Sequence, residues 1–432
     1  MGEGGGIMRL NLKPPQVFYG WWIVVACFAI ALYMAGVVFY GFTAIFEPIA
    51  EEFGWSYTQI SIAASIRGLE AGLLAPVVGI LVDRWGPRKL IFGGLLITGL
   101  GLILLSQVTS IGMFYVSFIL MSVGISSCGL SVTVTAVANW FRRRIGLATG
   151  IMICGYGASG VLVPVMVSLI DTYQWRTAMI ILALGMFVIC LPLALVVRHK
   201  PEQYGYLPDG EESGTEIATE RLISPPESEV SVSTRQALKA PAFWYITLGL
   251  LPQYIAVPAV ITHVMPYLSS LGFTRAMSGL VATAIPLLSI GGRFGFGWLA
   301  DKYEKKRLSA VALLLFMLGL ICFEYTSVGL VWLLVPFLIL FGVGYGGNVT
   351  MLGVLVREYF GRGNFGTIIG LMWGILMLGN MCGPPIAGWV FDQWGNYQWV
   401  WLAFAGLTII GAVIMMVTPS VSTTTQAKDR AS

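Results

Sequence analysis

Runs of about 20 apolar residues recur along this chain of 432 residues and leave it few ways to fold. An α-helix needs roughly 20 apolar residues to cross the hydrocarbon core of a bilayer. Only 11% of the residues are charged, whereas soluble proteins have about 25%. A backbone in lipid must satisfy its hydrogen bonds internally, so runs of this length form spanning helices. The sequence therefore predicts an all-α membrane protein that lies in a lipid bilayer.

Twelve apolar runs divide into two sets of six, with a polar segment between the sets. The predicted spans are about 20–46, 59–82, 88–106, 111–137, 144–170 and 175–197, then 241–269, 275–299, 306–325, 329–356, 365–391 and 396–417. These spans predict an N-terminal six-helix bundle over 20–197 and a C-terminal six-helix bundle over 241–417. The polar composition of the remaining parts suits solvated chain and predicts a leader at 1–19, a linker at 198–240 and a tail at 418–432.

Basic residues outside the runs fall almost entirely on one side of the predicted membrane. An even number of spans puts both chain ends on that side, where the loops carry Arg84, Arg144 and Lys305 among others. The loops of the other side carry only Arg176 and Arg275. Because cytoplasmic loops are enriched in lysine and arginine, we expect both termini and the linker to be cytoplasmic. The membrane is then a cytoplasmic (inner or plasma) membrane.

The two sets of spans repeat each other. The segment Gly79-Ile-Leu-Val-Asp83-Arg84 returns as Gly297-Trp-Leu-Ala-Asp301-Lys302, and Asp171 returns as Asp392. The offset stays near 220 residues, which indicates two homologous bundles related by pseudo-symmetry. Repeats of this kind commonly enclose a site at the membrane midplane that opens to alternate sides.

Arg293 is the leading functional candidate because it lies inside a predicted span. A charge near the bilayer centre costs about 2.5–3.5 kcal/mol on insertion scales and is tolerated where it faces a partner or a wet cavity. No acidic residue stands three or four positions from Arg293. A planar guanidinium matches a carboxylate with two hydrogen bonds, so Arg293 is predicted to bind an anion. The alternative is an arginine satisfied by helix carbonyls or by a carboxylate on another span.

Charged residues in two further places are candidates for gating or coupling. Arg67 and Glu70 lie three positions apart inside one span and are predicted to pair on a shared helix face. That pair is either structural or part of gating and coupling. A second set lies at the predicted cytoplasmic helix ends, where ion pairs between the halves would hold one access state closed or basic charge would only anchor the topology. This set contains Asp83, Arg84, Arg88, Asp301 and Lys302.

Polar and aromatic side chains within the spans complete the candidate substrate site. They are candidates because a hydrogen-bonding group inside a span needs either a ligand or a partner on another helix. For each of them the alternative is a hydrogen bond between helices. The candidates are Tyr33, Tyr40, Tyr156, Gln253, Tyr254, Tyr345, Asn348, Trp373 and Asn380.

No pattern in the sequence points to an enzyme or to a cofactor. A nucleotide-binding loop, a metal-ligand cluster and a nucleophile–base set are all missing. Residues 155–160 have the GxGxxG spacing, but they lie inside a span with no strand before them, so they do not indicate a dinucleotide. We therefore expect no catalytic residue, no metal, no nucleotide and no nucleic-acid partner. The sequence does not identify an accessory protein.

Three motifs resemble those of known transporters. Gly79-xxx-Asp83-Arg84-Trp-Gly-Pro-Arg88-Lys89 resembles the loop signature of the major facilitator superfamily. The segment from Trp140 to Gly155 resembles the fifth-span motif of monocarboxylate porters, and Tyr19-Gly-Trp-Trp22 resembles that group and the oxalate/formate antiporters. The resemblance implies twelve helices in two bundles. It also implies that Arg293 binds a substrate carboxylate, because an eighth-span arginine does so in both groups.

Three positions depart from the patterns of these groups. Where proton-driven porters have an aspartate one turn before the arginine, this chain has Ser289, and where they have a first-span lysine, it has Tyr40. Leu376 stands where the oxalate antiporters have a second cation. A single cation favours a singly charged anion over a dicarboxylate. The expected function is alternating-access transport of small monocarboxylates, similar in size to lactate and pyruvate.

The coupling ion and two other functions remain open at this point. Three couplings are possible: proton symport through Glu70, proton symport through the substrate–Arg293 pair, which we favour, and anion exchange without a proton. An exchanger of the oxalate/formate type is the alternative carrier. A more distant alternative is a protein that senses an anion without transporting it and signals through the linker.

Overall fold

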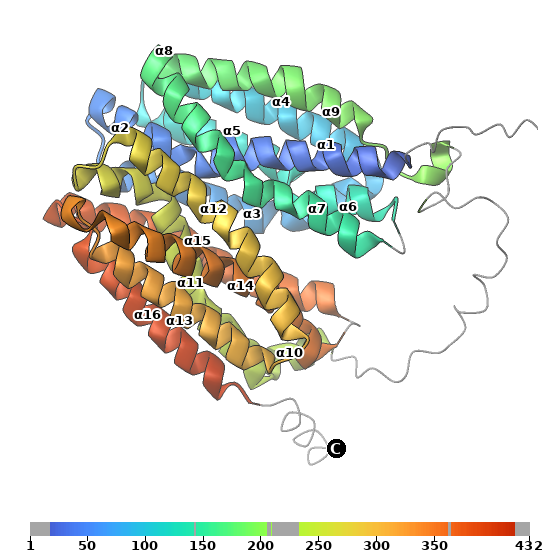
Figure 1. Ribbon diagram of the computed structural model, residues 1–432. Helices are drawn as coiled ribbons and strands as arrows, with labels where there is room; N and C mark the ends of the chain where they lie inside the picture. Colours follow the sequence, from blue (N-terminus) through green and yellow to red (C-terminus); the bar gives the residue numbers. More distant parts are fainter. Residues whose placement is uncertain (1–17, 142–143, 205–208, 210–232, 362–363, 420–432) are drawn as a thin grey trace, which may run out of the picture.

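The computed structural model describes residues 18–141, 144–204, 209, 233–361 and 364–419. In helix α3 (Tyr57–Trp85) the side chains of residues 69–73, 75, 76 and 83 are not described. Every regular element among the described residues is a helix. Figure 1 shows the helices in two groups, α1 to α9 and α11 to α16, which meet at one end and separate toward the other.

The first group begins with a span that is interrupted near its middle. This span consists of α1 (Tyr19–Met34), the π-helical segment η1 (Ala35–Tyr40) and α2 (Phe42–Phe53). The sequence predicts that this span ends at 46, where the apolar run ends. The helix instead continues to Phe53 and includes the charged residues Glu51 and Glu52. The rest of the group contains α3, α4 (Pro87–Ser106), α5 (Ile111–Cys128), α6 (Leu130–Ala138), α7 (Ile145–Ala158), η2 (Ser159–Val161), α8 (Leu162–Gly185), η3 (Met186–Cys190) and α9 (Leu191–Val196).

The second group contains six long helices. They are α11 (Pro241–Ser270), α12 (Arg275–Ala300), α13 (Lys305–Glu324), α14 (Leu334–Phe360) preceded by η8 (Val328–Leu333), α15 (Phe365–Trp394) and α16 (Gln398–Val417). Two short helices, η4 (Pro201–Tyr204) and α10 (Thr234–Lys239), lie within the predicted linker. The predicted leader up to residue 17 and most of the linker and tail lie outside the described residues. The residue limits predicted for the two bundles stay predictions.

The described helices make up twelve spans. Ten continuous helical runs among the described residues are long and apolar enough to cross a membrane. One of them, Ile145–Val196, contains two spans that meet at Gln174, whose φ of 67° and ψ of 155° turn the chain. Helix α3, with its 29 residues, supplies the remaining span. The predicted all-α fold of two six-helix bundles is thus confirmed.

Matching helix starts reflect the internal repeat. The hydroxyl of Ser56 accepts a hydrogen bond from the amide of Gln59 at 3.2 Å where α3 begins. The hydroxyl of Thr274 accepts one from the amide of Met277 at 3.3 Å where α12 begins. Each cap satisfies a backbone donor that the first turn of a helix leaves free. The starts of α3 and α12 lie 218 positions apart, the offset seen in the loop motif.

The two groups are joined by polar contacts at one end of the molecule, which we call the closed end. The Asp392 carboxylate at the end of α15 accepts hydrogen bonds from the amides of Tyr57 and Thr58, both at 2.8 Å, and from the Thr58 hydroxyl at 2.5 Å. Arg275 at the start of α12 forms an ion pair with Asp171 of α8 at 2.8 Å. The symmetry-related aspartates thus hold the starts of α3 and α12 across the two halves.

A buried histidine adds to the contacts at the closed end. His263 of α11 is fully buried. Its Nε2 donates to the Pro384 carbonyl at 3.0 Å and lies 2.9 Å from the Ser61 hydroxyl of the other half. Its Nδ1 lies 2.9 Å from the Tyr397 hydroxyl, within hydrogen-bond distance. His263 therefore links α3, α11, α15 and α16.

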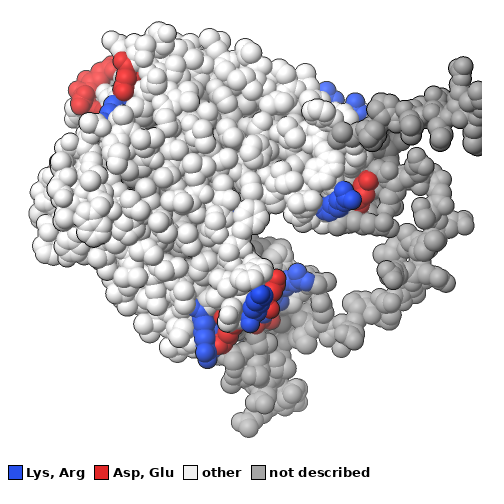
Figure 2. All heavy atoms as spheres, in the orientation of Figure 1, with Lys and Arg blue, Asp and Glu red and all other residues white. Residues whose placement is uncertain are grey.

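The opposite end, which we call the basic end, is open. Figure 2 shows a deep recess between the two lobes, with charged side chains on both sides of it. Among the described residues, the hydrogen bonds and ion pairs that join the halves lie in the part of the molecule between the closed end and the middle of the spans. One of those near the middle is the bond from the Ser65 hydroxyl to the Met381 carbonyl. Arg84 and Lys302, one on each half of the basic end, are both exposed.

Candidate substrate-binding site

Close packing of α12 against α14 sets the position of Arg293. The carbonyl of Val343 approaches Gly292, and the carbonyl of Ser289 approaches Gly346, so closely that neither position has room for a Cβ atom. Glycine allows such backbone contact because it has no side chain. Arg293 follows the first of these glycines and Tyr345 precedes the second, so the packing brings these two positions together.

The guanidinium of Arg293 has no protein partner among the described residues. Arg293 is half-buried, and its Nε is buried without a hydrogen-bond acceptor. Its side chain forms no ion pair with any described residue, although its backbone carbonyl accepts a bond from the Thr350 hydroxyl at 3.3 Å. A buried charged donor without an acceptor is costly. This guanidinium is therefore available to an anion that enters from outside the protein.

Two tyrosines, one from each half, lie near this cation and near Tyr345. Tyr40, the last residue of η1, lies near Arg293 and within hydrogen-bond reach of Tyr345. Tyr254 of α11 is likewise near Arg293 and Tyr345, and its ring meets the edge of Trp373 at 6.2 Å between centroids. The structure thus brings together five of the predicted site residues. Four belong to the second half, and Tyr40 belongs to the first.

Asn348 and Gln253 lie behind these side chains rather than beside a free space. Asn348 is fully buried, and its Oδ1 accepts from the Ser309 hydroxyl at 2.7 Å. Its Nδ2 donates to Gln253 Oε1 at 2.7 Å, and Gln253 Nε2 donates to the Tyr345 carbonyl at 3.3 Å. These amides connect α11, α13 and α14 and fix the backbone of Tyr345. The geometry favours a positioning role over the predicted contact with substrate.

The other three polar candidates lie apart from Arg293 in the contacts they make. The Tyr33 hydroxyl donates to the Leu182 carbonyl at 2.7 Å, and Tyr156 lies within hydrogen-bond reach of Thr133, both inside the first half. Asn380 contacts Met377 of its own helix at 3.5 Å. The contacts of Tyr33 and Tyr156 match the alternative of a hydrogen bond between helices, whereas that of Asn380 stays within its own helix.

Two of the positions at which this chain departs from the monocarboxylate porters and the oxalate/formate antiporters are buried. Leu376 has no exposed surface and lies in the apolar core of the second half in this conformation. Ser289 is also fully buried, and its hydroxyl donates to the Pro286 carbonyl at 2.7 Å. Neither position offers a second charge to the site.

Arg67 lies within the first half against an aromatic group. Its Nη1 donates to the Val38 carbonyl in η1. Its guanidinium carbon lies 4.8 Å from the ring centroid of Phe42, 5.5 Å from that of Phe39 and 5.9 Å from that of Phe118. The side chain of Glu70 lies outside the described residues, so the predicted Arg67–Glu70 pair stays a prediction.

Among the described side chains, the charges at the basic end form no ion pair between the halves in this conformation. Arg84, Asp301 and Lys302 are exposed, Arg88 is half-buried, and the side chain of Asp83 lies outside the described residues. Lys302 Nζ lies 3.8 Å from the ring centroid of Trp298 in its own helix. The predicted ion pairs between the halves belong to a state with the basic end closed, and they stay a prediction.

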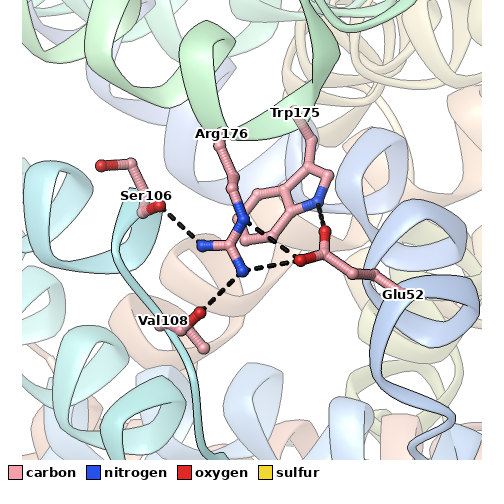
Figure 3. A network of polar contacts seen from close by, with 5 residues as sticks. All are labelled: Glu52, Ser106, Val108, Trp175 and Arg176. Atoms are coloured by element: carbon pink, nitrogen blue, oxygen red, sulfur yellow. Dashed lines mark hydrogen bonds and ion pairs between the residues drawn. The ribbon is translucent and has the colours of Figure 1, made fainter.

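The polar contacts at the closed end were not predicted from the sequence. The repeat of Asp171 as Asp392 was visible, but nothing in the sequence indicated which groups these carboxylates meet. A second network, which lies within the first half, surrounds Arg176 (Figure 3). Its Nη2 donates to Glu52 at 2.7 Å and to the Val108 carbonyl at 2.8 Å, and its Nη1 donates to the Ser106 carbonyl at 2.8 Å.

Comparison with known proteins gives the family. The model of the Major Facilitator Superfamily matches residues 22–379 and 259–431 of this chain. The chain belongs to the major facilitator superfamily. The solved structure of a bacterial homolog of the human lysosomal transporter Spinster, in an inward-facing and occupied conformation, has a TM-score of 0.71 at 14% identity. That match covers 94% of this chain and 97% of the other, so the two share a fold.

The similar sequences are transporters. Monocarboxylate transporter 12 of Xenopus laevis is 25% identical over 426 residues, which cover 94% of this chain and 90% of that protein. Monocarboxylate transporter 2 of Homo sapiens is 22% identical over 436 residues, which cover 96% and 89%. This superfamily member is therefore a multi-pass membrane transporter rather than an enzyme, and it resembles the monocarboxylate group, as its motifs predicted.

Proposed function

We propose that this protein is a secondary active transporter of small monocarboxylates, such as lactate- and pyruvate-sized anions, and that Arg293 binds their carboxylate group. The observation that carries this proposal is the half-buried guanidinium of Arg293, which has no partner among the described residues. Tyrosines from both halves lie around it. A carboxylate there accepts two charge-assisted hydrogen bonds from one guanidinium.

The charges near Arg293 favour an anion with a single negative charge. Tyr40 supplies a hydroxyl rather than an ammonium group, and the buried Leu376 supplies no second cation. A dicarboxylate would leave one carboxylate without a cationic partner in a low-dielectric site, which is unfavourable. Tyr254, Tyr345 and Trp373 offer apolar ring surface and hydroxyl groups to the rest of the substrate.

We propose that transport proceeds by alternating access between the two halves. The closed end is joined across the halves by Asp392, Arg275 and His263, and the basic end is open. Because basic loops face the cytoplasm, the site opens to the cytoplasm in this conformation, and both termini are cytoplasmic. Breaking the closed-end contacts and joining the basic ends exposes the site to the other side of a cytoplasmic membrane.

Uptake is proposed to be coupled to a proton that moves with the substrate–Arg293 pair. The carboxylate neutralises Arg293 when the site is occupied, and a proton that crosses together with this pair makes uptake of the anion electroneutral. Ser289 offers no carboxylate as a separate proton carrier at that position. The absence of such a carboxylate equally supports the alternative, in which one anion is exchanged for another and no proton is moved.

Uptake into proteoliposomes tests the proposal and separates its two forms. The purified chain is reconstituted, and uptake of radiolabelled lactate is measured with an imposed inward proton gradient or with internal lactate and no gradient. Gradient-driven uptake that persists in Glu70→Gln supports coupling through the substrate–Arg293 pair, whereas its loss with binding intact moves the proton to Glu70. Uptake that responds only to internal anion identifies an exchanger. No uptake of any monocarboxylate under either condition contradicts the proposal.

A further inference from the structure

We propose that Arg67 is a positioning residue for the substrate site and acts by fixing the π-helical segment that ends in Tyr40. This inference rests on the proposed function, because it assigns Tyr40 a contact with the same substrate. It concerns a residue that touches neither Arg293 nor any of the three tyrosines in the contacts described above. The argument follows the chain of contacts from α3 through η1 to the site.

The first step is the shape of the first span. Residues 35–40 form a π-helical segment between α1 and α2, and Gly41 follows it. A π-helical turn accommodates an extra residue relative to an α-helix and commonly occurs at functional sites. It also turns the following side chains to a different face. Tyr40 ends this segment and lies near Arg293 and Tyr345 of the other half.

The second step is what holds this unusual turn. Arg67 of α3 donates from Nη1 to the carbonyl of Val38, which lies two positions before Tyr40. Its guanidinium lies over the rings of Phe39 and Phe42, one position before and two positions after Tyr40. A guanidinium over aromatic faces combines electrostatic attraction with packing. Arg67 therefore contacts the chain on both sides of Tyr40, at Val38 and Phe39 in η1 and at Phe42 in α2.

The third step is the packing on the other side of the segment. Any Cβ added to Gly36 would lie 2.6 Å from the Ser159 carbonyl of η2. The sulfur of Met166 in α8 similarly fills the space beside Gly41. The segment is thus held between η2 and α8 on one side and Arg67 on the other. Removing the guanidinium frees one side only, so the helix persists while Tyr40 loses its fixed position.

The fourth step is the place of Tyr40 in the site. Tyr40 is 5% exposed, lies near Arg293 and is within hydrogen-bond reach of Tyr345. A hydroxyl held in place before binding lowers the entropic cost of ordering it on the ligand. Arg67 therefore raises the affinity for substrate through Tyr40, with less effect on the movement of the halves.

A double-mutant cycle in proteoliposomes tests this inference. The half-saturation concentration for radiolabelled lactate uptake is compared in the wild type, Arg67→Lys, Tyr40→Phe and the double variant. We expect each single variant to raise the half-saturation concentration about tenfold. Loss of one charge-assisted or well-placed hydrogen bond produces a change of this size. The double variant should raise it no further than the larger single effect, because both changes act through Tyr40. The inference would be overturned if the increases of the two single variants multiplied in the double variant. It would also be overturned if Arg67→Lys left the half-saturation concentration unchanged.

Two controls keep the inference separate from folding and from the proposed function. Arg176→Lys removes another guanidinium fork from the first half and should leave the half-saturation concentration unchanged. If Arg67→Lys does not fold, Phe118→Leu removes one ring beside the guanidinium and should give a smaller change that vanishes in the Tyr40→Phe background.

Hydrogen exchange supplies a measurement that needs no substrate. Amides of residues 35–41 should exchange faster in Arg67→Lys than in the wild type and in Arg176→Lys, whichever anion is carried. Unchanged exchange in that segment contradicts the positioning role. A different outcome would contradict the proposed function alone. In that outcome the segment exchanges faster in Arg67→Lys than in the wild type, but the wild type takes up no monocarboxylate.

Discussion

The closed end and the central site use the same kinds of side chain in opposite ways. At the closed end, Arg176 donates to two backbone carbonyls and to Glu52, and Asp392 accepts three hydrogen bonds. At the centre, the guanidinium of Arg293 donates to no described residue. Satisfied polar groups stabilise one arrangement of helices. A cation left without a partner in a half-buried position instead marks the place where a ligand completes the structure.

The ion pair that joins the halves at the closed end is weak enough to break. Asp171 and Arg275 keep 49% and 26% of their side-chain surface exposed, and exposed ion pairs of this kind contribute about 0–1 kcal/mol. A carrier must pass between two states whose free energies differ by only a few kcal/mol. A set of modest contacts therefore suits an end that opens in each cycle.

The largest expected effect is the loss of transport when the central cation changes shape. Arg293→Lys keeps the positive charge but replaces a planar fork with a point charge. We expect monocarboxylate uptake to fall at least tenfold, since two parallel hydrogen bonds to the carboxylate are lost. Arg176→Lys serves as the control and should transport at close to the wild-type rate. Normal uptake by Arg293→Lys would place the carboxylate elsewhere.

The next effect concerns the buried position Leu376. Leu376→Lys puts an ammonium group into the apolar core of the second half, where it has no partner among the described residues. We expect a cost of several kcal/mol, seen as a lower melting temperature and a lower yield of folded protein in detergent. A variant that folds normally and gains dicarboxylate binding would show instead that residue 376 reaches the cavity.

A smaller effect is expected at the start of α3. Asp392→Ala removes the carboxylate that accepts from the amides of Tyr57 and Thr58. Loss of about 1 kcal/mol, as for a helix cap, shifts the balance between the two access states about fivefold away from this one. Distances between spin labels on Tyr173→Cys and Trp399→Cys, in a background without other cysteines, report the shift. A distance distribution identical to that of the parent would show that Asp392 does not hold the closed end.

The smallest effect is expected at the symmetry-related position. Asp171→Ala removes one half-exposed ion pair with Arg275, while the bond from Arg275 to the Ala44 carbonyl at 2.7 Å remains. The same spin-label distances should shift by less than with Asp392→Ala, about twofold in population at most. A larger shift than that of Asp392→Ala would reverse the order that the hydrogen bonding predicts.

Much of the fold was readable from the sequence because membrane spans follow from length and hydrophobicity alone. The predicted spans 275–299 and 88–106 correspond to α12 (Arg275–Ala300) and α4 (Pro87–Ser106). The interruption of the first span was not predicted. The π-helical turn at residues 35–40 and Gly41 after it lie against Arg67, Ser159 and Met166, which are distant in sequence.

The site was predictable only where a residue was chemically out of place. Arg293 could be identified because a charge inside an apolar run needs an explanation. Asn348 and Leu376 could not be placed in the same way, because the face that a helical residue presents depends on the neighbouring helices. Asn348 meets Ser309 and Gln253, and Leu376 packs into an apolar core. A single sequence does not show which helices pack against one another.

The central claim is that Arg293 recognises the carboxylate group, and one binding measurement tests it most directly. Dissociation constants for lactate and for its neutral amide are measured by calorimetry on the purified wild type and on Arg293→Gln. The claim predicts that the wild type binds lactate at least tenfold more tightly than the amide. It also predicts that Arg293→Gln binds the two about equally. A preference for lactate that survives in Arg293→Gln would show that another group recognises the carboxylate.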